Sequence, residues 1–517
     1  MSATWPPQLG KKLDYPEVAA GAILAGSARR YGDRVAFRHH DEELTYADLW
    51  QRACQFANGL ISEGVRSGDR VALVMPNNLA FPVAYYGLLL AGATFVPVNP
   101  LMPPEALKAQ VEDAGAVRVL TAADVQPIWA GQPDTPPVVE IDIYNDLAHL
   151  AYTGGTTGVS KGVRLPHRNV VVNTLQFACW QTGSVPALDD EGGLILDQVS
   201  DPSEFPSRLG QGIAINLTPW FHAMGTIAGL NVLVMGGVTA TLHDRFDPAA
   251  FLADAERLGI TYLGGAPALF AGLLAHPDMQ TRDLSTVLSI GSGAAPMPLE
   301  MSKALQRLMP KAVIGEGYGL TEVTMGACAG PTWVSGKHKI GSVGVPVFDT
   351  EIKVVEPGSE EPLPAGERGE VCIRGPQVMA GYHNRPDATA EVLVDGWLHT
   401  GDIGVIDEDG FLSIVDRIKD MLLYKGYNVY PRELEELLIA HPDVAMAAVV
   451  GRKQTDVGEL PVAFVIPAKP DINTDQLMAD INEKVAPYKR LREIILTDQI
   501  PVSAAGKILK RELRDRL

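Results

Sequence analysis

Residues 152–162 read Tyr-Thr-Gly-Gly-Thr-Thr-Gly-Val-Ser-Lys-Gly, a run of small and hydroxylated residues that leads to one lysine. Glycines let a backbone approach an anion, hydroxyls donate hydrogen bonds, and Lys161 supplies a positive charge. The stretch is therefore typical of a phosphate-binding loop, and a plain Gly/Thr surface loop is the alternative. It is not a Walker loop, because Ser160 precedes the lysine and Gly162 follows it.

The flanking segments favour the phosphate-binding loop. Residues 147–152 are predicted to form a short strand, and a helix-like segment follows from His167 to Gln176. Further out, helix and strand patterns alternate from Tyr15 to about Pro100, which indicates a layered α/β domain with parallel strands. A second Gly-rich loop, 291–296, follows a predicted strand, and such loops bind ligands in α/β sheets.

Four further motifs lie downstream. They are GYGLTE at 317–322, GWLHTGD at 396–402, DRIKD at 416–420 with KGY at 425–427, and PVSAAGK at 501–507. With the first loop they resemble, in order and over nearly the whole chain, the motifs of adenylate-forming enzymes. That superfamily comprises acyl-CoA synthetases, peptide-synthetase adenylation domains and beetle luciferases. Each motif alone is a modest signal, whereas five in the family's order are specific.

The domain organisation follows from length, pattern and resemblance together. A chain of 517 residues is too long for one compact core. Residues 184–212 interrupt the α/β pattern and are expected to form an exposed insertion, and a helix is predicted at 299–308. From about residue 351 short strands and turns replace the α/β rhythm, and a further strand is predicted at 493–496. The resemblance implies a large α/β N-terminal domain over 1–416, with a β-rich subdomain at about 345–416. A hinge at 417–420 would then lead to a small, mobile α+β C-terminal domain over 421–517.

The resemblance also implies a nucleotide site. The β- and γ-phosphates would be held by Thr153, Gly154, Gly155, Thr156, Thr157 and Lys161, and the α-phosphate would be contacted by Thr321, which follows Gly317, Tyr318 and Gly319. Glu322 would bind Mg²⁺. The ribose would be held by Asp402 and Arg417, and the adenine slot would be lined by Gly293, Ala294 and Ala295. An exposed loop carboxylate is the alternative for Glu322, a capped turn for Asp402 and a solvated salt bridge for Arg417.

The acid and CoA sites are implied in the same way. Lys507 would reach the acyl carboxylate and the α-phosphate, with a merely basic C-terminal tail as the alternative, and Lys419 is the expected hinge. Gly426, beside Lys425, would let the pantetheine arm of CoA pass, because a side chain there would fill a narrow tunnel. The acyl pocket would be lined by Trp220, Phe221, Met224 and Gly225, with His222 at its mouth. A histidine in an aromatic run is otherwise a core residue, and the bulk of Trp220 leaves the pocket's shape open.

Bulk composition restricts the partners. A formal net charge of -19 without a basic stripe argues against nucleic acid, so an anionic nucleotide needs local donors and a metal ion. The four cysteines lack metal-like spacing and are expected to be buried free thiols. Residues 1–14 contain no apolar run, and no stretch of about 20 apolar residues occurs. We therefore expect a cytoplasmic protein without a spanning helix.

The expected function is that of an acyl-CoA synthetase, which forms acyl-AMP from an acid and ATP and then transfers the acyl group to CoA. Asn99-Pro100-Leu101 and the double glycine of the first loop resemble the fatty acyl members, so a medium- or long-chain fatty acid is the leading substrate. An aryl or cyclic acid is the runner-up. A ligase that loads a carrier protein, a non-catalytic scaffold and a homodimer are left open.

Overall fold

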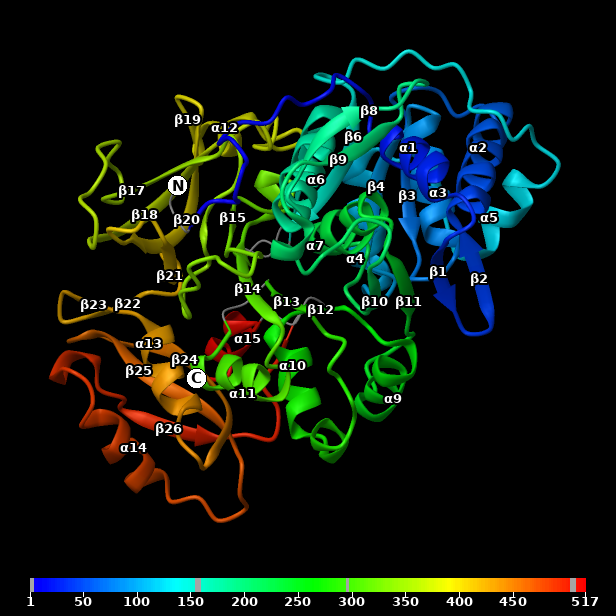
Figure 1. Ribbon diagram of the computed structural model, residues 1–517. Helices are drawn as coiled ribbons and strands as arrows, with labels where there is room; N and C mark the ends of the chain where they lie inside the picture. The colour runs from blue at the N-terminus through cyan, green and yellow to red at the C-terminus, as the bar shows by residue number, and fades with distance from the viewer. Residues whose placement is uncertain (1–3, 154–159, 294–296, 503–507) are drawn as a thin grey trace.

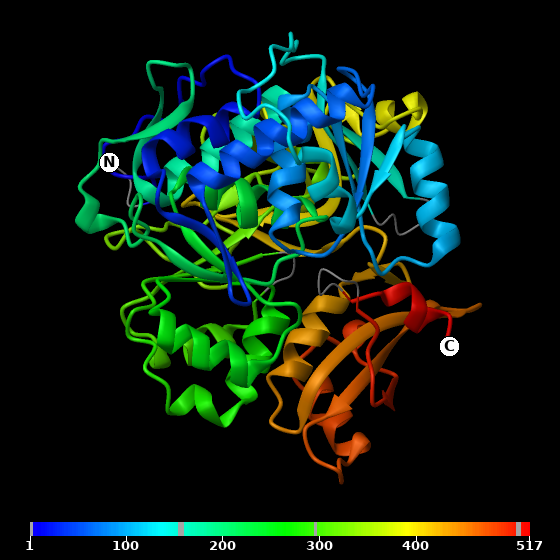
Figure 2. The same cartoon turned by 90° about the vertical axis from the view of Figure 1, so that its right-hand side faces the viewer.

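The computed structural model describes residues 4–153, 160–293, 297–502 and 508–517. The chain forms a large α/β N-terminal part and a small α+β C-terminal part, drawn in orange and red in Figure 1. This confirms the predicted fold class. Figure 2 shows that the C-terminal part lies beside the green helices of residues 248–308, below the rest of the molecule. The domain limits at 345, 416 and 421 remain predictions.

Two large sheets form the framework of the N-terminal part. The five-stranded sheet has the order β5 (Arg118–Leu120), β3 (Arg70–Val74), β4 (Thr94–Val98), β6 (Leu147–Thr153) and β7 (Lys161–Pro166). Its first four strands are parallel, whereas β7 is antiparallel to β6. All five residues of β4 are buried, as expected where helices cover both faces of a parallel sheet.

The second sheet has nine strands. Its order is β16 (Val345–Pro346), β15 (Cys328–Ala329), β14 (Val313–Tyr318), β13 (Ser289–Ser292), β12 (Tyr262–Gly265), β10 (Ile213–Asn216), β11 (Thr239–Leu242), β1 (Val35–His39) and β2 (Glu42–Thr45). Strands β14 to β1 along this order are parallel, and the outer strands are antiparallel. The motifs at 291–296 and 317–322 therefore begin at the carboxyl ends of neighbouring strands.

Helices pack on both sheets. They are α1 (Ala22–Tyr31), α2 (Tyr46–Ser62), α3 (Ala80–Leu90), α4 (Pro104–Ala114), α5 (Ala122–Trp129), α6 (His167–Thr182), α7 (Ala223–Thr226), η2 (Ile227–Val232), α8 (Leu233–Met235), α9 (Pro248–Leu258), α10 (Pro267–Ala275) and α11 (Leu299–Leu308). Helix α6 is central, since nearly every residue from His167 to Thr182 is buried. A helix that is buried on all sides belongs to the core of a large domain.

A buried polar chain joins α3, β6 and η2. The Tyr86 hydroxyl donates to Asn231 Oδ1 at 2.8 Å, and Asn231 Nδ2 donates to the Tyr85 hydroxyl at 2.7 Å. The Tyr85 hydroxyl lies 2.9 Å from His149 Nε2. Tyr85 accepts from Asn231, so its own proton can be donated to His149 when the ring is neutral and Nε2 carries no proton. Burial lowers the pKa of His149 to about 3.

Two smaller sheets complete the chain. The β-rich sheet contains β17 (Glu351–Val355), β18 (Arg368–Arg374), β19 (Leu393–Val394), β20 (Trp397–Ile406) and β21 (Leu412–Arg417), with α12 (Pro386–Ala390) beside it. The C-terminal sheet contains β22 (Leu422–Tyr424), β23 (Tyr427–Val429), β24 (Val444–Gln454), β25 (Gly458–Pro467) and β26 (Glu493–Leu496), packed with α13 (Pro431–Ile439), α14 (Thr474–Asn482) and α15 (Lys510–Arg514).

Two sequence expectations need correction. The segment 184–212 was expected to be an exposed insertion, but it begins with an antiparallel hairpin of β8 (Ser184–Leu188) and β9 (Leu194–Gln198). Leu194 and Phe205 are fully buried, so apolar anchors attach this segment to the core. Strands β2 and β7 were also missed. The first loop therefore joins two antiparallel strands, β6 and β7, before helix α6 begins.

The four cysteines, Cys54, Cys179, Cys328 and Cys372, are free thiols with no exposed surface, as expected. Burial raises the pKa of each thiol above its ordinary value. Among the described residues, no helix combines the length and the apolar character that crossing a bilayer requires.

Candidate active site

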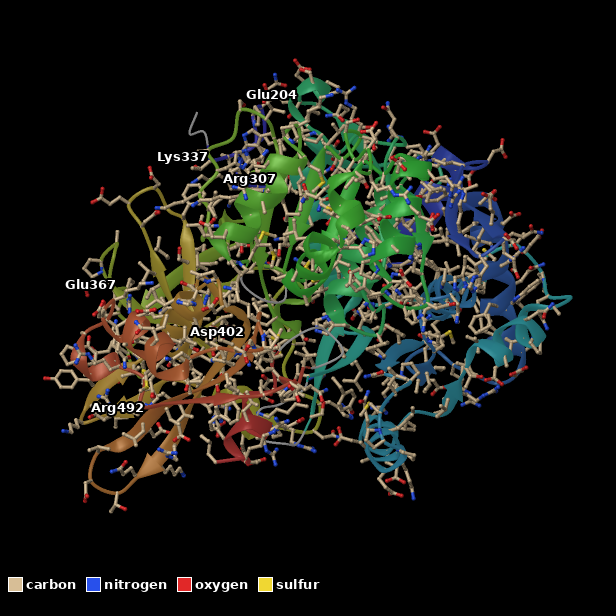
Figure 3. All side chains as sticks on the ribbon, turned by 90° about the horizontal axis from the view of Figure 1, so that it is seen from below. Glu204, Arg307, Lys337, Glu367, Asp402 and Arg492 are labelled. Atoms are coloured by element: carbon tan, nitrogen blue, oxygen red, sulfur yellow. The ribbon has the colours of Figure 1, made fainter. Side chains whose placement is uncertain are left out.

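Three of the predicted nucleotide-site residues meet at the end of strand β14. The Tyr318 hydroxyl donates to Asp402 Oδ2 at 2.6 Å, and Arg417 Nε lies 3.1 Å from Asp402 Oδ1. The Asp402 side chain is only 7% exposed, whereas that of Arg417 is 36% exposed. Burial and the nearby Asp402 carboxylate raise the pKa of Tyr318 far above its usual value, so its hydroxyl remains a donor. Figure 3 labels Asp402 close to the orange C-terminal part.

The chain turns sharply between Tyr318 and Glu322 because Gly319 allows it. A Cβ at Gly319 would clash with the carbonyl oxygen of Met325. The short 3-10 helix η4 (Thr321–Val323) follows this glycine, and Thr324, at φ 69°, ends it in the left-handed region. Thr321 and Glu322 are thereby placed side by side at the carboxyl end of the sheet, both partly exposed.

Glu322 and Lys161 are joined through Tyr382, a residue that the sequence motifs did not single out. The Tyr382 hydroxyl donates to Glu322 Oε1 at 2.8 Å, and Lys161 Nζ lies 4.7 Å from the centre of the Tyr382 ring. Tyr382 also pairs with Val163 of β7. Burial, followed by the charge of Glu322, raises the pKa of Tyr382. The Gly381-Tyr382 step, with φ 115° at Gly381, is the local sign that could have drawn attention to it.

Much of the first loop lies outside the described residues. Gly154, Gly155, Thr156 and Thr157 belong to that part, as do Ala294 and Ala295 of the predicted adenine slot. The described ends of the first loop are Thr153 and Lys161, which are register partners across β6 and β7. The Ser160 hydroxyl donates to the Thr153 carbonyl and ties the two ends together.

The predicted acyl segment adjoins the nucleotide motifs. His222 caps α7, and its Nδ1 accepts a hydrogen bond from the Met224 N–H at 3.3 Å. A Cβ at Gly225 would clash with the Pro219 carbonyl, so only glycine fits there. The Met224 sulfur lies 3.4 Å from the Cβ position of Gly293. Phe221, His222 and Met224 are partly exposed, and the segment lies against the end of β13.

Trp220 is placed differently from its neighbours in the segment. Its side chain is fully buried, and its ring packs against Phe37 and Phe81 with centroids 5.3 Å away in both cases. Its indole N–H donates to the Gly229 carbonyl at 2.9 Å. These contacts belong to the core behind the acyl segment, so the assignment of Trp220 to the pocket stays a prediction.

Beside Met224, a row of glycines crosses three strands of the large sheet. Gly264 of β12 pairs with Gly291 of β13, which pairs with Gly315 of β14. Register partners point to the same face, so this part of the sheet carries no side chains. The Tyr262 ring leans over it, with the hydroxyl 2.5 Å from the Cβ position of Gly264. The row is a narrow strip of sheet next to Gly293 that carries no side chains of its own, and the Tyr262 ring covers it over Gly264 and Gly291.

The predicted CoA residues form a tight turn in the C-terminal part. Tyr424 and Tyr427 are partners across β22 and β23, so Lys425 and Gly426 form a two-residue hairpin. Both have positive φ, 50° and 83°, which is the type I′ geometry that favours glycine. No described atom lies within 4 Å of the Cβ position of Gly426. The turn geometry by itself favours glycine here, and the role of Gly426 in passing the pantetheine arm stays a prediction.

Of the predicted hinge residue and the predicted C-terminal catalytic lysine, only the hinge residue lies among the described residues. Lys419 is exposed in the turn after β21, whereas Lys507 lies outside the described residues. The tail after it is not simply a basic surface. Lys510 Nζ lies 2.9 Å from Glu435, both side chains being nearly buried, and Arg514 pairs with Asp420. These cations therefore have structural partners of their own.

Comparisons with known proteins agree with this arrangement. The family model of AMP-binding enzymes matches residues 24–383, and that of the AMP-binding enzyme C-terminal domain matches residues 433–507. A feruloyl-CoA synthase from Amycolatopsis sp is 36% identical over 95% of this chain and 97% of its own length. A long-chain-fatty-acid–CoA ligase from Bacillus subtilis is 32% identical over 99% of this chain and 97% of its own length. The structure of o-succinylbenzoate coenzyme A synthetase from Bacillus subtilis, in complex with ATP and magnesium ion, superposes on this chain with a TM-score of 0.79. The sequence identity is 27%, and the superposition covers 96% of this chain and 99% of that chain.

Proposed function

We propose, since the chain belongs to the AMP-binding enzyme family and is an AMP-forming acid–thiol ligase, that its acid is a medium- or long-chain fatty acid and its thiol is CoA. The single observation that carries the proposal is that the motif residues meet around the carboxyl ends of β13 and β14. Asp402 contacts Tyr318 and Arg417, Tyr382 links Glu322 to Lys161, and Met224 and the Gly317 carbonyl lie within 4.0 Å of the Cβ position of Gly293.

This arrangement matches what the reaction needs from the protein. In the first step a carboxylate oxygen attacks the α-phosphorus of ATP, and pyrophosphate leaves. In the second step the CoA thiolate attacks the acyl carbon, and AMP leaves. Both steps bring anions together, so positioning and charge neutralisation lower the barrier. Asp402 would accept hydrogen bonds from the ribose hydroxyls, Lys161 and Thr153 would hold the outer phosphates, and Thr321 would donate to the α-phosphate.

The residues present fit a magnesium ion. Glu322 offers carboxylate oxygens, the ligand type that Mg²⁺ prefers, on a partly exposed turn beside the lysine of the first loop. Its Oε1 accepts from Tyr382, which orients the group and leaves further lone pairs for an ion. A bound Mg²⁺ would neutralise phosphate charge during adenylation. Lys507 would supply the second positive charge, at the α-phosphate and the acyl carboxylate.

The glycine row supports an alkyl chain as the substrate's tail. The strip has no side chains of its own, and the Tyr262 ring, whose hydroxyl lies 2.5 Å and 2.6 Å from the Cβ positions of Gly264 and Gly291, occupies the space above it. An alkyl chain would lie along the strip with this ring turned aside. Each buried methylene contributes about 0.8 kcal/mol, so the strip would favour longer acids. A ligase of this family with 99% coverage of the chain acts, by its name, on long-chain fatty acids. An aryl acid is the second candidate, because the feruloyl-CoA synthase is 36% identical.

A substrate panel tests the proposal. Pyrophosphate release and thioester formation would be measured with hexanoate, decanoate, palmitate, ferulate and benzoate, each with and without CoA. The expected result is CoA-dependent thioester with the highest kcat/KM for decanoate or palmitate. A preference for ferulate by more than tenfold would replace the fatty acid with the aryl acid. Adenylation without any thioester from free CoA would point to a carrier protein as acceptor.

A further inference from the structure

Strands β18 and β20 form a bulge next to Asp402. Cys372 pairs with His399, whereas Glu370 pairs with Ile403, so the single residue Val371 lies opposite three residues of β20. Those three are Thr400, Gly401 and Asp402. Gly401 has φ 70°, a conformation that favours glycine. Bulges beside active sites re-aim a side chain, and this one presents Asp402 to Tyr318 and Arg417.

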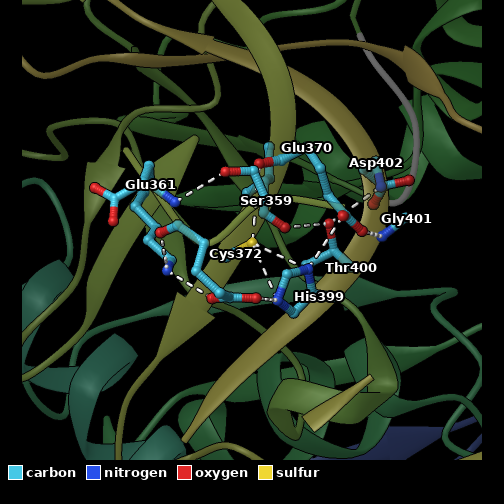
Figure 4. Close-up of polar contacts among 11 residues, drawn as sticks. Ser359, Glu361, Glu370, Cys372, His399, Thr400, Gly401 and Asp402 are labelled. Carbon is cyan, nitrogen blue, oxygen red and sulfur yellow. Dashed lines mark hydrogen bonds and ion pairs between the residues drawn. The ribbon is translucent and has the colours of Figure 1, made fainter. Parts of the chain in front are cut away.

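Side chains satisfy the backbone groups that the bulge removes from the ladder. Glu370 Oε1 accepts from the Gly401 N–H at 3.0 Å. Thr400 Oγ1 accepts from the Asp402 N–H at 3.1 Å and donates to the Val371 carbonyl at 2.8 Å. Figure 4 shows these contacts together. The conformation of the bulge therefore depends on the Glu370 carboxylate, which lies on the strand opposite.

His399 holds that carboxylate in place. Its Nδ1 lies 3.1 Å from Glu370 Oε2, and its Nε2 lies 2.9 Å from Glu360 Oε1 (Figure 4). Both ring nitrogens therefore face carboxylate oxygens, and the ring links Glu370 to Glu360. The side chains of His399 and Glu370 are only 12% and 10% exposed. A buried carboxylate needs such a partner to remain charged.

Cys372 also contacts this ring. Its Sγ lies 3.5 Å from Nδ1 and 3.9 Å from Nε2 of His399. Glu370, Cys372 and His399 bring three potential metal-ligand atoms within 4.8 Å of one another. Both ring nitrogens already face carboxylates, however, so the geometry favours a hydrogen-bonded pair and not a metal centre.

We propose that Glu370 and His399 form a positioning pair, which fixes the bulge at Thr400–Asp402 so that Asp402 can accept hydrogen bonds from the ribose hydroxyls of ATP. The pair does not touch the nucleotide and acts through the Gly401 N–H. This inference rests on the proposed ribose role of Asp402, so both must be tested in the same assay.

The assay compares ATP with 2′-deoxy-ATP. The ratio of their kcat/KM values measures ribose recognition, which a general loss of stability would not change. Asp402→Asn is expected to lower this ratio about tenfold, as hydrogen bonds to charged groups generally do. Glu370→Gln and His399→Leu are expected to lower it by a similar factor, mainly through the KM for ATP. His399→Gln, which keeps a donor for Glu370, is expected to restore part of the ratio.

Glu351→Gln is the matched control, because Glu351 is an exposed residue of the same sheet whose partner is Arg374. An unchanged ratio in Asp402→Asn would remove the ribose assignment and this inference with it. A lowered ratio in Asp402→Asn with unchanged ratios in Glu370→Gln and His399→Leu would overturn the positioning pair alone. An equal loss of kcat/KM for both nucleotides in the two variants would also overturn it. If Glu370→Gln does not fold, the comparison of His399→Gln with His399→Leu decides.

Discussion

At the scale of single residues, Tyr382 connects two proposed functions through one side chain. Its hydroxyl orients Glu322, and its ring lies under Lys161. Tyr382→Phe removes the first contact and keeps the second. We expect the Mg²⁺ concentration for half-maximal adenylation to rise about three- to tenfold, since one hydrogen bond to a carboxylate is lost, with little change in Tm. Titration of Mg²⁺ at fixed ATP measures this, and an unchanged magnesium dependence would contradict the orientation of Glu322 by the Tyr382 hydroxyl.

Trp220 gives the second residue-scale prediction. Because its indole packs on Phe37 and Phe81 in the core, Trp220→Ala should cost about 3–5 kcal/mol of unfolding free energy. Urea denaturation measures this loss. The milder Trp220→Phe keeps most of the packing and should leave the preferred acyl chain length unchanged. If the preferred acyl chain length of Trp220→Phe shifted towards longer acids, the indole would instead be assigned to the acyl pocket.

Residue types at the site could be predicted from sequence motifs, but their contacts could not. The resemblance predicts that Asp402 and Arg417 bind the same ribose, and Arg417 Nε lies 3.1 Å from Asp402 Oδ1. Tyr382 escaped notice because its partners, Lys161 and Glu322, are distant in sequence and reach it only through tertiary pairing with β7. Trp220 belongs to an apolar run whose pattern does not distinguish a pocket wall from the core behind it.

At the scale of elements, the buried polar chain through Tyr85 and His149 makes the packing of α3 on β6 sensitive to pH. Burial lowers the pKa of His149 to about 3 and that of His167 to about 4, from ordinary values near 6.5. The unfolded chain therefore binds more protons than the folded chain between those values. The stability from these residues is complete above pH 6.5 and is lost as the pH falls, by about 1.4 kcal/mol per pH unit for each histidine.

His149→Gln tests this dependence, because glutamine can accept the Tyr85 hydroxyl proton without titrating. Urea midpoints would be measured from pH 7.5 to 5, above the range of ordinary carboxylates. The wild-type protein should lose stability over this interval, and the variant should lose clearly less. Equal slopes for the two proteins would mean that the pKa of His149 is the same in the folded and the unfolded chain.

Element boundaries show which local patterns determine structure. The helix predicted at 299–308 corresponds to α11, and the strand at 493–496 to β26. Strand β7 was missed because Lys161–Pro166 combines a glycine, an arginine and a proline, and it becomes a strand only by pairing with β6. The hairpin at 184–198 was missed because its acidic turn dominates the local composition, whereas its anchor, Leu194, is buried against distant residues.

At the scale of the whole molecule, two reciprocal variants test whether the C-terminal part changes position between the half-reactions. Lys507→Ala should abolish adenylation and spare thioester formation from supplied acyl-AMP, because its charge is needed only in the first step. Lys419→Pro should do the reverse, since proline restricts φ at the expected hinge, and acyl-AMP should accumulate. Each half-reaction is assayed separately. Equal loss of both in Lys507→Ala, or wild-type turnover in Lys419→Pro, would contradict a rotating C-terminal domain.

The buried thiols have a consequence for the fate of the intermediate. Acyl-AMP is a mixed anhydride that acylates accessible thiolates, so an enzyme that holds it risks modifying itself. None of the four cysteine side chains has exposed surface, and burial keeps each in the protonated, unreactive form. CoA therefore meets no competing thiol on the protein that carries the activated acid. An exposed cysteine engineered near Met224 would end that protection, and it would be labelled by the enzyme's own product.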